Sequence, residues 1–341
     1  MPDHFSLNAL TFRVLRLLGA GGFVSGADLA RTLGVSRTSV WKALQGVEQA
    51  GVDLIRQHAR GYRLAAPIDW LGSEAISQHI GVHRELYEVR IADMVESTNT
   101  TLLAEATAGA PSGRVLAAEL QTRGRGRRGR DWHSGLGGAL TFSVLWRFDQ
   151  GAGYLAGLGP AVGVALVRGL RALGVQEIAL KWPNDVLIWH QKVAGTLVEI
   201  QGDVLGPSAA VVGVGVNFRL HEATRQRIDQ AVIDLVAGGA PADRNRVLGK
   251  LLAQLADVLQ IFSMHGFGAL RKEWEGMHVY SGRPVSVRLP GGGQQDGTVA
   301  GVGDDGALLL QTTSGLRRFH SGEVSLRAAA APGRPRWTSN G

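Results

Sequence analysis

The strongest constraint on the fold of this chain is the run Gln-Thr-Arg-Gly-Arg-Gly-Arg-Arg-Gly-Arg-Asp-Trp at residues 121–132, hereafter the Arg/Gly loop. It holds five arginines and three glycines and lies between two segments, 114–121 and 139–146, whose alternating apolar residues predict strands. Composition alone favours a solvated basic loop or a nucleic-acid-binding arm. The alternative is an anion-binding loop, since glycines let backbone N–H groups approach a phosphate or carboxylate and arginines supply charge-assisted donors.

The overall composition sets the class of protein. Its 341 residues predict two or three domains with a sizeable core. No apolar run approaches the roughly 20 residues of a membrane span, and the N-terminus lacks the pattern of a signal peptide. Cysteine is absent, which excludes disulfides, thiolate zinc sites and a cysteine nucleophile. We therefore expect a cytoplasmic protein that does not enter a membrane.

The charge is distributed unevenly. A net charge of +7 and a pI near 10.2 predict polyanionic partners. Residues 1–66 carry eight Lys/Arg against four Asp/Glu and so hold more than half of the excess. The N-terminal region and the Arg/Gly loop are thus two basic features that need separate explanations.

The N-terminal region has the pattern of a winged helix-turn-helix. Helices are predicted over 8–18, from Ser25 through Leu33 and over 37–50, and short strands over 52–56 and 60–65. The exposed face of the third helix predicts DNA contacts in a major groove. A charged helix face in a protein–protein module is the alternative, and one member of the face, a tryptophan, could instead pack under the wing. The face consists of Arg37, Thr38, Trp41, Lys42 and Gln45.

Three polar groups follow in the central region. Ser97-Thr98-Asn99 comes after a predicted strand, 86–95, and either caps a helix at 100–108 or binds a ligand in front of it. Lys181-Trp182-Pro183-Asn184-Asp185 is a bend at a strand end, because proline cannot donate to a sheet ladder. It is either a polar turn or a set of side chains facing one ligand. Lys192 begins the third group, in strand 192–200.

In the two predicted strands 192–200 and 208–217, one face carries several glycines. Alternation places Lys192 on the face opposite Gly195. In the next strand Gly213, Gly215 and Asn217 alternate with valines, which leaves one face nearly bare. A flat ligand lying on the sheet needs such a face, although close helix packing also explains it.

The rest of the chain completes the pattern. Helices are predicted over 74–80, 154–173 and 246–262, with Pro160 either kinking the second of these or marking its first turn. Residues 219–245 predict a loop with a short helix. Short strands at 284–288, 297–301, 307–311 and 316–319 predict a small β-barrel of SH3-like type.

In this order the segments resemble the bifunctional biotin–protein ligases, which in bacteria double as biotin operon repressors. Gly-Arg-Gly-Arg-Arg-Gly (124–129) together with Lys-Trp-Pro-Asn-Asp (181–185) is a highly specific combination, and the resemblance covers nearly the whole chain. It implies an α+β multidomain fold. The parts are a winged helix-turn-helix DNA-binding domain (1–66), a mixed-sheet α/β catalytic domain like those of the biotin and lipoyl ligases (67–275), an SH3-like domain (276–329) and a flexible tail (330–341).

The resemblance also implies the chemistry. Biotin's carboxylate attacks the α-phosphorus of ATP to give biotinyl-5′-AMP, and a lysine of biotin carboxyl carrier protein then takes the biotinyl group. ATP and Mg²⁺ are needed, with no tightly bound metal. The carrier is a subunit of acetyl-CoA carboxylase or of another biotin-dependent carboxylase. Operator DNA binds residues 1–66, and the adenylate-bound protein is a homodimer.

Residue roles follow from matching motif positions. The resemblance implies that biotin's polar ring is held by Ser97, Thr98, Asn99 and Gln121, and that its carboxylate and the adenylate phosphate are bracketed by Arg125, Gly126 and Arg127. Lys192 reaches the carboxylate and the α-phosphate. Lys181 and Asn184 contact phosphates, Asp185 assists Mg²⁺ and is the nearest candidate for a general base, and Asn217 lies near the nucleotide. Arg127, Lys192, Lys181 and Asp185 form the expected catalytic set.

One departure from the family pattern concerns adenine, which repressor-type ligases stack on an aromatic residue after the Asn217 motif. Residues 219–261 contain no Trp, Tyr or Phe, so Ile228, Val232, Ile233 or His221 is expected to take that place. Three alternatives remain open: a lipoate–protein ligase, a biotin-sensing repressor without ligase activity, and a ligase that no longer represses. The winged helix and the Arg/Gly loop disfavour the first, and the phosphate-contacting set disfavours the second.

Overall fold

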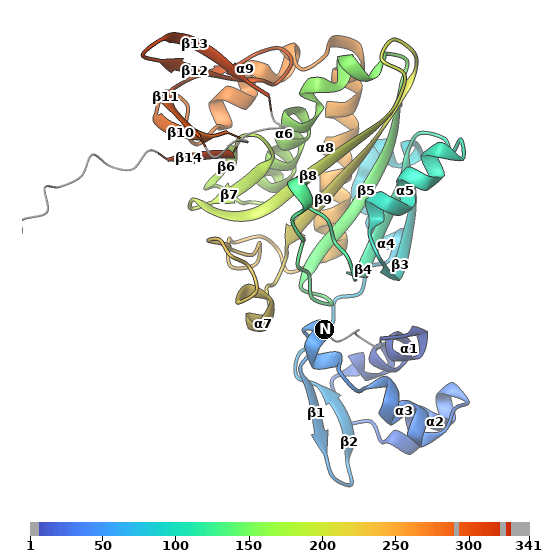
Figure 1. The fold of residues 1–341 in the computed structure, drawn as a ribbon. Coiled ribbons are helices and arrows are strands. Elements are labelled where there is room, and N and C mark those ends of the chain that lie inside the picture. The colour runs from blue at the N-terminus through green and yellow to red at the C-terminus, as the bar shows by residue number, and fades with distance from the viewer. Residues whose placement is uncertain (1–6, 290–292, 321–324, 329–341) are drawn as a thin grey trace, which may run out of the picture.

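The computed structural model of the chain describes residues 7–289, 293–320 and 325–328 (Figure 1). The tail predicted at 330–341 lies outside these residues. A winged helix-turn-helix comes first, at the bottom of the view, and is made of α1 (Ala9–Leu17), α2 (Gly26–Leu33), α3 (Arg37–Ala43), β1 (Leu54–Gln57) and β2 (Gly61–Leu64). Ser25 and Ser36 cap α2 and α3, each accepting a hydrogen bond from a backbone N–H three residues on.

The prediction of one helix over 37–50 was wrong. Helix α3 ends at Ala43, and a separate 3-10 turn, η2 (Val47–Ala50), follows. Gly46 has a φ of +77°, a left-handed conformation that glycine adopts at little cost and that ends the helix. Leu44 and Val47 remain fully buried, so the apolar stripe continues although the helix does not.

The winged-helix domain packs directly on the rest of the chain. Its apolar core includes Leu120 and Leu136 of the central domain, and Leu136 N–H donates to Ala50 O over 2.8 Å. Arg16 pairs with Asp93 at 2.5 Å, and its guanidinium lies 4.5 Å from the ring centre of Trp70. The winged-helix domain is therefore held against the next domain by apolar packing, a hydrogen bond and an ion pair.

The central domain is built on a seven-stranded mixed sheet in the order β3-β4-β5-β9-β8-β7-β6. Only the β3–β4 pair is parallel. The strands are β3 (Glu88–Val95), β4 (Arg114–Gln121), β5 (Ala139–Phe148), β6 (Ile178–Lys181), β7 (Asp185–Ile188), β8 (Gln191–Gly202) and β9 (Ser208–Asn217). The helices are α4 (Ser73–Ile80), α5 (Thr98–Thr107), α6 (Leu158–Ala172), α7 (Glu222–Arg225), α8 (Arg244–His265) and α9 (Gly268–Met277).

The two faces of this sheet follow from residue alternation. Val144 and Val212 face the main core with helices α4, α6, α8 and α9, whereas Leu145 and Val211 face α5. Each face thus buries every second side chain, and α5 stands alone on its side of the sheet (Figure 1). The ends of β4, β5, β8 and β9 remain available for a site.

A buried ion pair inside the central domain holds the segment that follows the winged-helix domain, because both partners bond to its backbone. Arg244 and Glu119 are fully buried, with Nη1 and Oε2 2.7 Å apart. Arg244 also donates to the backbone oxygens of Asp69 and Ala139, and Glu119 accepts from Leu71 N–H. Removing one partner of such a pair costs about 3–5 kcal/mol, because the other charge is left buried.

Two helical segments, Ala152–Ala172 and Arg244–His265, are long and apolar enough by composition to cross a membrane. Most of each is buried inside the domain, 72% and 56% of the apolar window. Pro160 lies in the first turn of α6 after the 3-10 turn η5 (Ala152–Gly157), so it begins the helix rather than kinking it. Helix α9 and strand β6 were not predicted.

A five-stranded antiparallel sheet in the order β13-β12-β11-β10-β14 ends the described chain. It confirms the predicted small β-domain and adds one strand to the four expected. Its strands are β10 (Pro284–Arg288), β11 (Gln294–Val302), β12 (Leu308–Thr312), β13 (Gly315–Phe319) and β14 (Ser325–Ala328).

Candidate active site

A pocket of about 630 Å³ opens where the Arg/Gly loop, the start of α5 and the β6–β7 turn meet over the sheet. The structure brings the twelve residues expected to contact biotin, the phosphates and Mg²⁺ to this one cavity. They are Ser97, Thr98, Asn99, Gln121, Arg125, Gly126, Arg127, Lys181, Asn184, Asp185, Lys192 and Asn217. The same lining contains seven Lys/Arg side chains against three Asp side chains. A small polyanion is the kind of ligand that such a cavity favours.

The polar residues at the start of α5 line the pocket, and one of them, Ser97, caps the helix. Ser97 is the N-cap and accepts from Thr100 N–H. Gln121 Oε1 accepts from the backbone N–H and the hydroxyl of Thr98, at 2.7 and 3.0 Å. Ser143 Oγ, from β5, lies 2.7 Å from Thr98 Oγ1 and 2.5 Å from Asn99 Oδ1. The cap interpretation is confirmed at Ser97. The same three residues line the pocket, so the ligand-binding interpretation stays a prediction.

The Arg/Gly loop folds back on itself. Gly126 N–H donates to Arg130 O at 2.7 Å, and Trp132 N–H donates to Gly124 O at 2.8 Å. Arg127 Nη1 lies 3.3 Å from Asn184 Oδ1 across the pocket. The loop is ordered by contacts within the chain before any ligand is considered.

Side chains of the chain itself cover the bare face of β8 and β9. A Cβ at Gly215 would overlap the indole of Trp132, and a Cβ at Gly213 would overlap the amide of Asn99. At Gly215 the indole of Trp132, a residue singled out only as the end of the loop, covers the face on which a flat ligand was predicted to lie. Glycine is required at both positions by these close approaches.

The Lys181–Asp185 segment is a hairpin turn between β6, the edge strand of the sheet, and β7. Lys181 pairs with Asp185 across the hairpin, and the Trp182–Pro183 peptide is cis. Asn184 Nδ2 donates to Thr196 O at 2.7 Å. Trp182 is buried and donates to Gly306 O of the C-terminal sheet, which leaves the lysine, asparagine and aspartate on the pocket.

Lys192 and Asp185 form an ion pair at the base of the pocket. Lys192 Nζ lies 2.7 Å from Asp185 Oδ1, and the two side chains are only 17% and 20% exposed. The ammonium is also 5.7 Å from the ring centre of Trp132. Because the two side chains are mostly shielded from water, their charges act on a ligand with little screening.

The prediction that Lys192 and Gly195 lie on opposite faces was wrong. A β-bulge interrupts the pairing of β7 with β8, since Val186 pairs with Ala194 but Leu187 pairs with Lys192. The extra residue, Val193, shifts the alternation by one position. The Lys192 side chain consequently lies over Gly195, inside the pocket.

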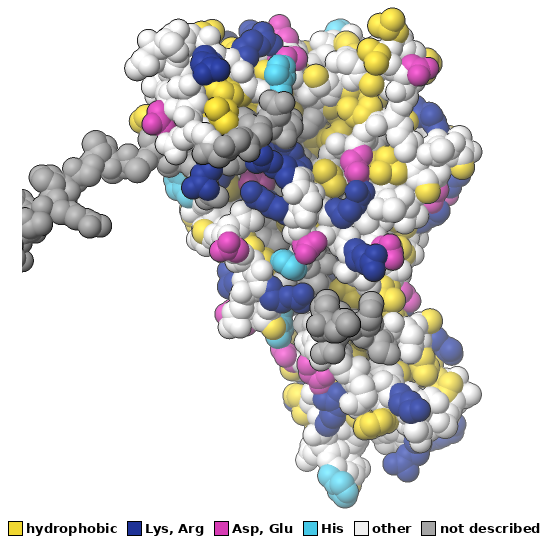
Figure 2. All heavy atoms as spheres, in the orientation of Figure 1, with side chains coloured by type: hydrophobic (Ala, Val, Ile, Leu, Met, Phe, Trp, Pro, Cys, Tyr) yellow, Lys and Arg dark blue, Asp and Glu magenta, His cyan; other side chains and the backbone are white. Residues whose placement is uncertain are grey.

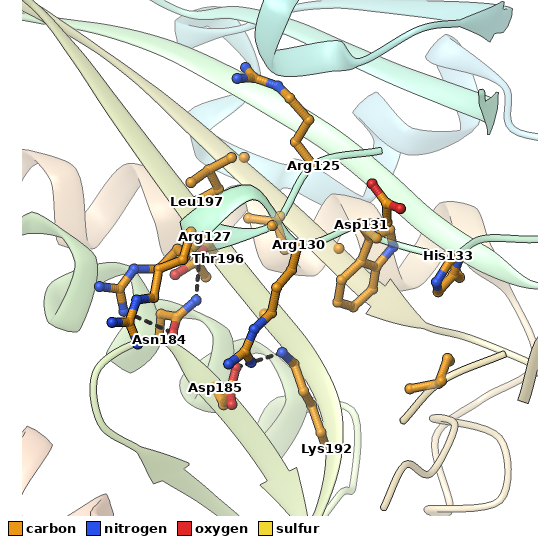
Figure 3. A pocket seen from close by; sticks show the side chains of 18 of the residues that line it. Arg125, Arg127, Arg130, Asp131, His133, Asn184, Asp185, Lys192, Thr196 and Leu197 are labelled. Carbon is orange, nitrogen blue, oxygen red and sulfur yellow. Dashed lines mark hydrogen bonds and ion pairs between the residues drawn. The ribbon is translucent and has the colours of Figure 1, made fainter. Parts of the chain in front are cut away.

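The three loop arginines labelled in Figure 3 point in two directions. In Figure 3, Arg127 extends toward Asn184, and Arg130 extends toward Asp185 and Lys192. Arg125 points the opposite way and pairs with Glu199 at 2.8 Å. Burial lowers the pKa of Arg127 from its ordinary value, against the opposing effect of Asp185. The guanidinium nonetheless stays charged at neutral pH.

The chain matches known proteins along its length. Residues 91–217 match the biotin/lipoate A/B protein ligase family, 280–327 the biotin protein ligase C terminal domain, and 11–63 the HTH domain. The chain is 33% identical over 322 residues to the bifunctional ligase/repressor BirA of Escherichia coli, which covers 94% of this chain and 98% of that protein. It belongs to the biotin protein ligase family.

Two further relatives agree with this assignment. The biotin–[acetyl-CoA-carboxylase] ligase of Mycobacterium tuberculosis is 34% identical over 268 residues, 77% of this chain and 97% of that protein. A biotin protein ligase from Aquifex aeolicus, solved in complex with biotin and ATP, superposes with a TM-score of 0.60 at 29% identity, covering 71% of this chain and 99% of that one. The predicted family, fold class and enzyme class are confirmed.

Sequence reasoning missed several lining residues of this biotin protein ligase. Arg130 and Trp132 lie inside the quoted loop but received no role. Ser143, in β5, lies outside the lining and contacts the lining residues Thr98 and Asn99, a role that the strand pattern gave no sign of. Arg227 and His133 come from separate loops. Burial and the neighbouring Arg227 both lower the pKa of His133, which keeps its imidazole neutral at physiological pH.

The loop after β9 closes the far side of the pocket. Of the four adenine contacts expected, Ile228 and Val232 line the cavity. Ile233 belongs to the main core, and His221 pairs with Asp53 of the winged-helix domain at 3.0 Å. Asn217 donates to the backbone oxygens of Lys192 and Ile233, each at 3.2 Å, and so ties this loop to β8.

The predicted DNA-contacting residues lie outside this pocket, on the winged-helix domain. Arg37, Thr38, Trp41, Lys42 and Gln45 are exposed on α3 or just beyond its end. Trp41 is 51% exposed, which contradicts the alternative that it packs under the wing. Within residues 7–289, 293–320 and 325–328, neither Arg37 nor Lys42 has an ion-pair partner.

Proposed function

We propose that this ligase forms biotinyl-5′-AMP from biotin and ATP and transfers the biotinyl group to a lysine of a biotin carboxyl carrier protein. The observation that carries the proposal is the pocket. It places the Lys192–Asp185 pair and Arg127 beside the polar cluster at the start of α5. A cation-rich cavity with a neutral polar end suits a ligand that joins an uncharged ring to a phosphate.

In the first half-reaction a carboxylate must approach a triphosphate. The biotin carboxylate oxygen attacks the α-phosphorus, the bond to the bridging oxygen breaks, and pyrophosphate leaves. Positioned cations offset the repulsion and the charge that builds on the oxygens. We assign this task to Lys192, Arg127 and Lys181, with Arg130 added by its place in the pocket.

Magnesium enters the proposal with ATP. In the portion of the chain that the structure describes, no group of three or more His, Cys, Asp or Glu side chains is arranged to hold a metal. Mg²⁺ in phosphoryl transfer is commonly held by one or two carboxylates together with substrate phosphates. Asp185 provides one such carboxylate, so the residues fit an ion shared with the nucleotide.

In the second half-reaction the lysine amine of the carrier attacks the acyl carbon, and AMP leaves. The leaving group is a phosphate, so Arg127 and Lys192 act again. Asp185 is the carboxylate placed to accept the amine's proton, because it lies beside Lys192 at the base of the pocket. The Arg/Gly loop excludes water, which would otherwise hydrolyse the adenylate.

Biotinylation of a purified carrier domain tests the proposal. The chain, ATP, Mg²⁺ and biotin are expected to add one biotinyl mass to the acceptor lysine, read by mass spectrometry. A parallel incubation with lipoate separates the two ligase types. Transfer of lipoate alone, or of neither acid, would contradict the assignment.

The exposed basic face of α3 supports a second activity, repression of biotin genes by binding operator DNA as a homodimer. Gel shifts on the promoters of the organism's own biotin genes, with and without biotin plus ATP, test it. Failure to shift in either condition would leave a cytoplasmic ligase whose winged helix has another role.

A further inference from the structure

Glu199, in β8, connects two parts of the pocket that the proposed function treats separately. Its Oε2 accepts a hydrogen bond from Arg125 Nη2 at 2.8 Å and another from Asn99 Nδ2 at 2.8 Å. The side chain is 26% exposed, and the Arg125 side chain is 43% exposed. One carboxylate thus contacts both the Arg/Gly loop and the polar cluster at the start of α5.

The contact with Glu199 decides which way the Asn99 amide points. Asn99 Nδ2 also donates to Leu197 O at 3.1 Å, so both acceptors face the nitrogen. The oxygen is then directed to Ser143 Oγ, 2.5 Å away. Turning the amide over would place its oxygen against a carboxylate and a carbonyl, which is unfavourable. Glu199 therefore orients a residue expected to hold biotin's ring.

The contact with Arg125 anchors the first half of the Arg/Gly loop. Arg125 points away from the side chains gathered around Asp185 and Lys192 (Figure 3), so its guanidinium ties the loop to β8. Arg127, bonded to Asn184, is a second tie, and Trp132 lies on the sheet as a third. Among these three ties the Arg125–Glu199 contact is the one in which both partners are ionised, a charge-assisted hydrogen bond of the strong kind.

We infer that Glu199 is a positioning residue for the ligase reaction, which holds the Arg/Gly loop closed through Arg125 and orients Asn99 toward bound biotin. This inference rests on the proposed function. Glu199 does not touch the reacting atoms in this view, and its loss affects how long biotin and the adenylate stay bound. The chemical step itself depends on the cations around Lys192.

The test replaces the charge and keeps the shape, with Glu199→Gln. We expect the KM for biotin to rise, and biotinyl-AMP to dissociate about tenfold to a hundredfold faster, as for the loss of a hydrogen bond to a charged group. The kcat for pyrophosphate release at saturating substrates stays within about twofold. Glu105→Gln is the matched control, because Glu105 pairs with Arg90 at nearly the same exposures, 26% and 39%, away from the pocket. It is expected to leave every constant unchanged.

A double-mutant cycle that combines Glu199→Gln with Arg125→Met tests whether the two residues retain the adenylate together or independently. If the pair acts as a unit, the double variant releases the adenylate no faster than the worse single variant. Effects that multiply, or an unchanged dissociation rate in Glu199→Gln, overturn the inference. Should Glu199→Gln fail to fold by circular dichroism, Arg125→Met alone decides, because unchanged release in that variant is equally fatal.

Failure of this inference can be told apart from failure of the proposed function. The wild-type chain must first form and retain biotinyl-AMP. If it forms none, the ligase proposal fails before Glu199 is tested. If it forms and retains the adenylate, and the Glu199→Gln variant does the same at the same rates, only the positioning role is wrong.

Discussion

The two basic regions of this protein, the Arg/Gly loop and the outer face of α3, have similar side chains and opposite surroundings. In the loop, Arg125 and Arg127 bond to Glu199 and Asn184, and the loop closes over a cavity. On α3, Arg37 and Lys42 project into solvent. Lys and Arg side chains appear in Figure 2 both on the winged-helix domain and over the catalytic domain.

The difference indicates that the surroundings of the basic side chains, cavity or open surface, decide which kind of anion they suit, because the residue types are the same. Cations in a cavity with low exposure act on a small anion at short range, where water screens them little. Cations on an exposed helix act on an extended polyanion, and their effect weakens as salt is added. The same residue types therefore predict tight, salt-tolerant binding of a nucleotide in one region and salt-dependent binding of DNA in the other.

The largest effect is expected at Lys192. The Lys192→Ala variant should form biotinyl-AMP about 10²–10³-fold more slowly, since one preorganised donor to the developing charge is lost. Pyrophosphate release measures this rate. Lys272→Ala, on the exposed surface of α9, is the control and should match the wild type. A rate within about fivefold of wild type in Lys192→Ala would remove this lysine from the enclosed catalytic set.

Arg127 should affect retention of the intermediate. The Arg127→Gly variant loses a half-buried guanidinium and its bond to Asn184. We expect the adenylate to dissociate about tenfold to a hundredfold faster, and the released compound to label lysines of bystander proteins. Bovine serum albumin added to the assay reports this labelling on a streptavidin blot. Unlabelled albumin together with normal carrier biotinylation would show that Arg127 does not retain the adenylate.

Substitutions on the exposed face of α3 should weaken DNA binding and leave the ligase reaction unchanged. Arg37→Ala and Lys42→Ala are each expected to weaken operator binding about tenfold and, where the side chain contacts a phosphate, to lower the slope of log K against log salt by about one. Carrier biotinylation should be unchanged. Arg31→Ala is the control, because Arg31 is exposed on α2 and paired with Asp28. Equal loss in the control would assign the effect to overall charge.

Sequence reasoning succeeded where periodicity and motif order carry the information. Alternation in β5 and β9 predicts the sheet, and the order of the polar motifs predicts that Asn99, Arg127 and Lys192 share one site. Both features depend on residues close together in the chain or on a resemblance that spans it. The small β-domain followed from its turn residues for the same reason.

The wrong and missing predictions have physical causes that cannot be read from the residues next to them in the sequence. The bulge at Val193 moves Lys192 to the other face, and a single extra residue leaves no mark in the alternation of its neighbours. Gly46 ends α3 although the apolar stripe runs on. Ser143 and Glu199 gain their importance from side chains far away in sequence. The packing of the winged-helix domain on Leu120 and Leu136 is equally non-local.

The smallest effect is expected at a contact between the winged-helix domain and the loop after β9. Asp53, in the winged-helix domain, lies 3.0 Å from His221, in the loop that follows β9 and borders the pocket. The carboxylate is 64% exposed, and exposed pairs contribute at most about 1 kcal/mol. Asp53→Ala should therefore shift the melting temperature only slightly and leave adenylate retention and operator affinity within about twofold.

The control is Asp93→Ala, which breaks another contact between the two domains, with Arg16; Asp93 is 37% exposed and lies outside the pocket lining. If Asp53→Ala alone speeds adenylate release by more than about threefold, the His221 contact transmits the state of the pocket to the DNA-binding domain. Reciprocity then requires that the adenylate change operator affinity through the same contact. The Arg/Gly loop and the face of α3 would then still bind different ligands. Their two binding free energies, however, would no longer be independent of each other.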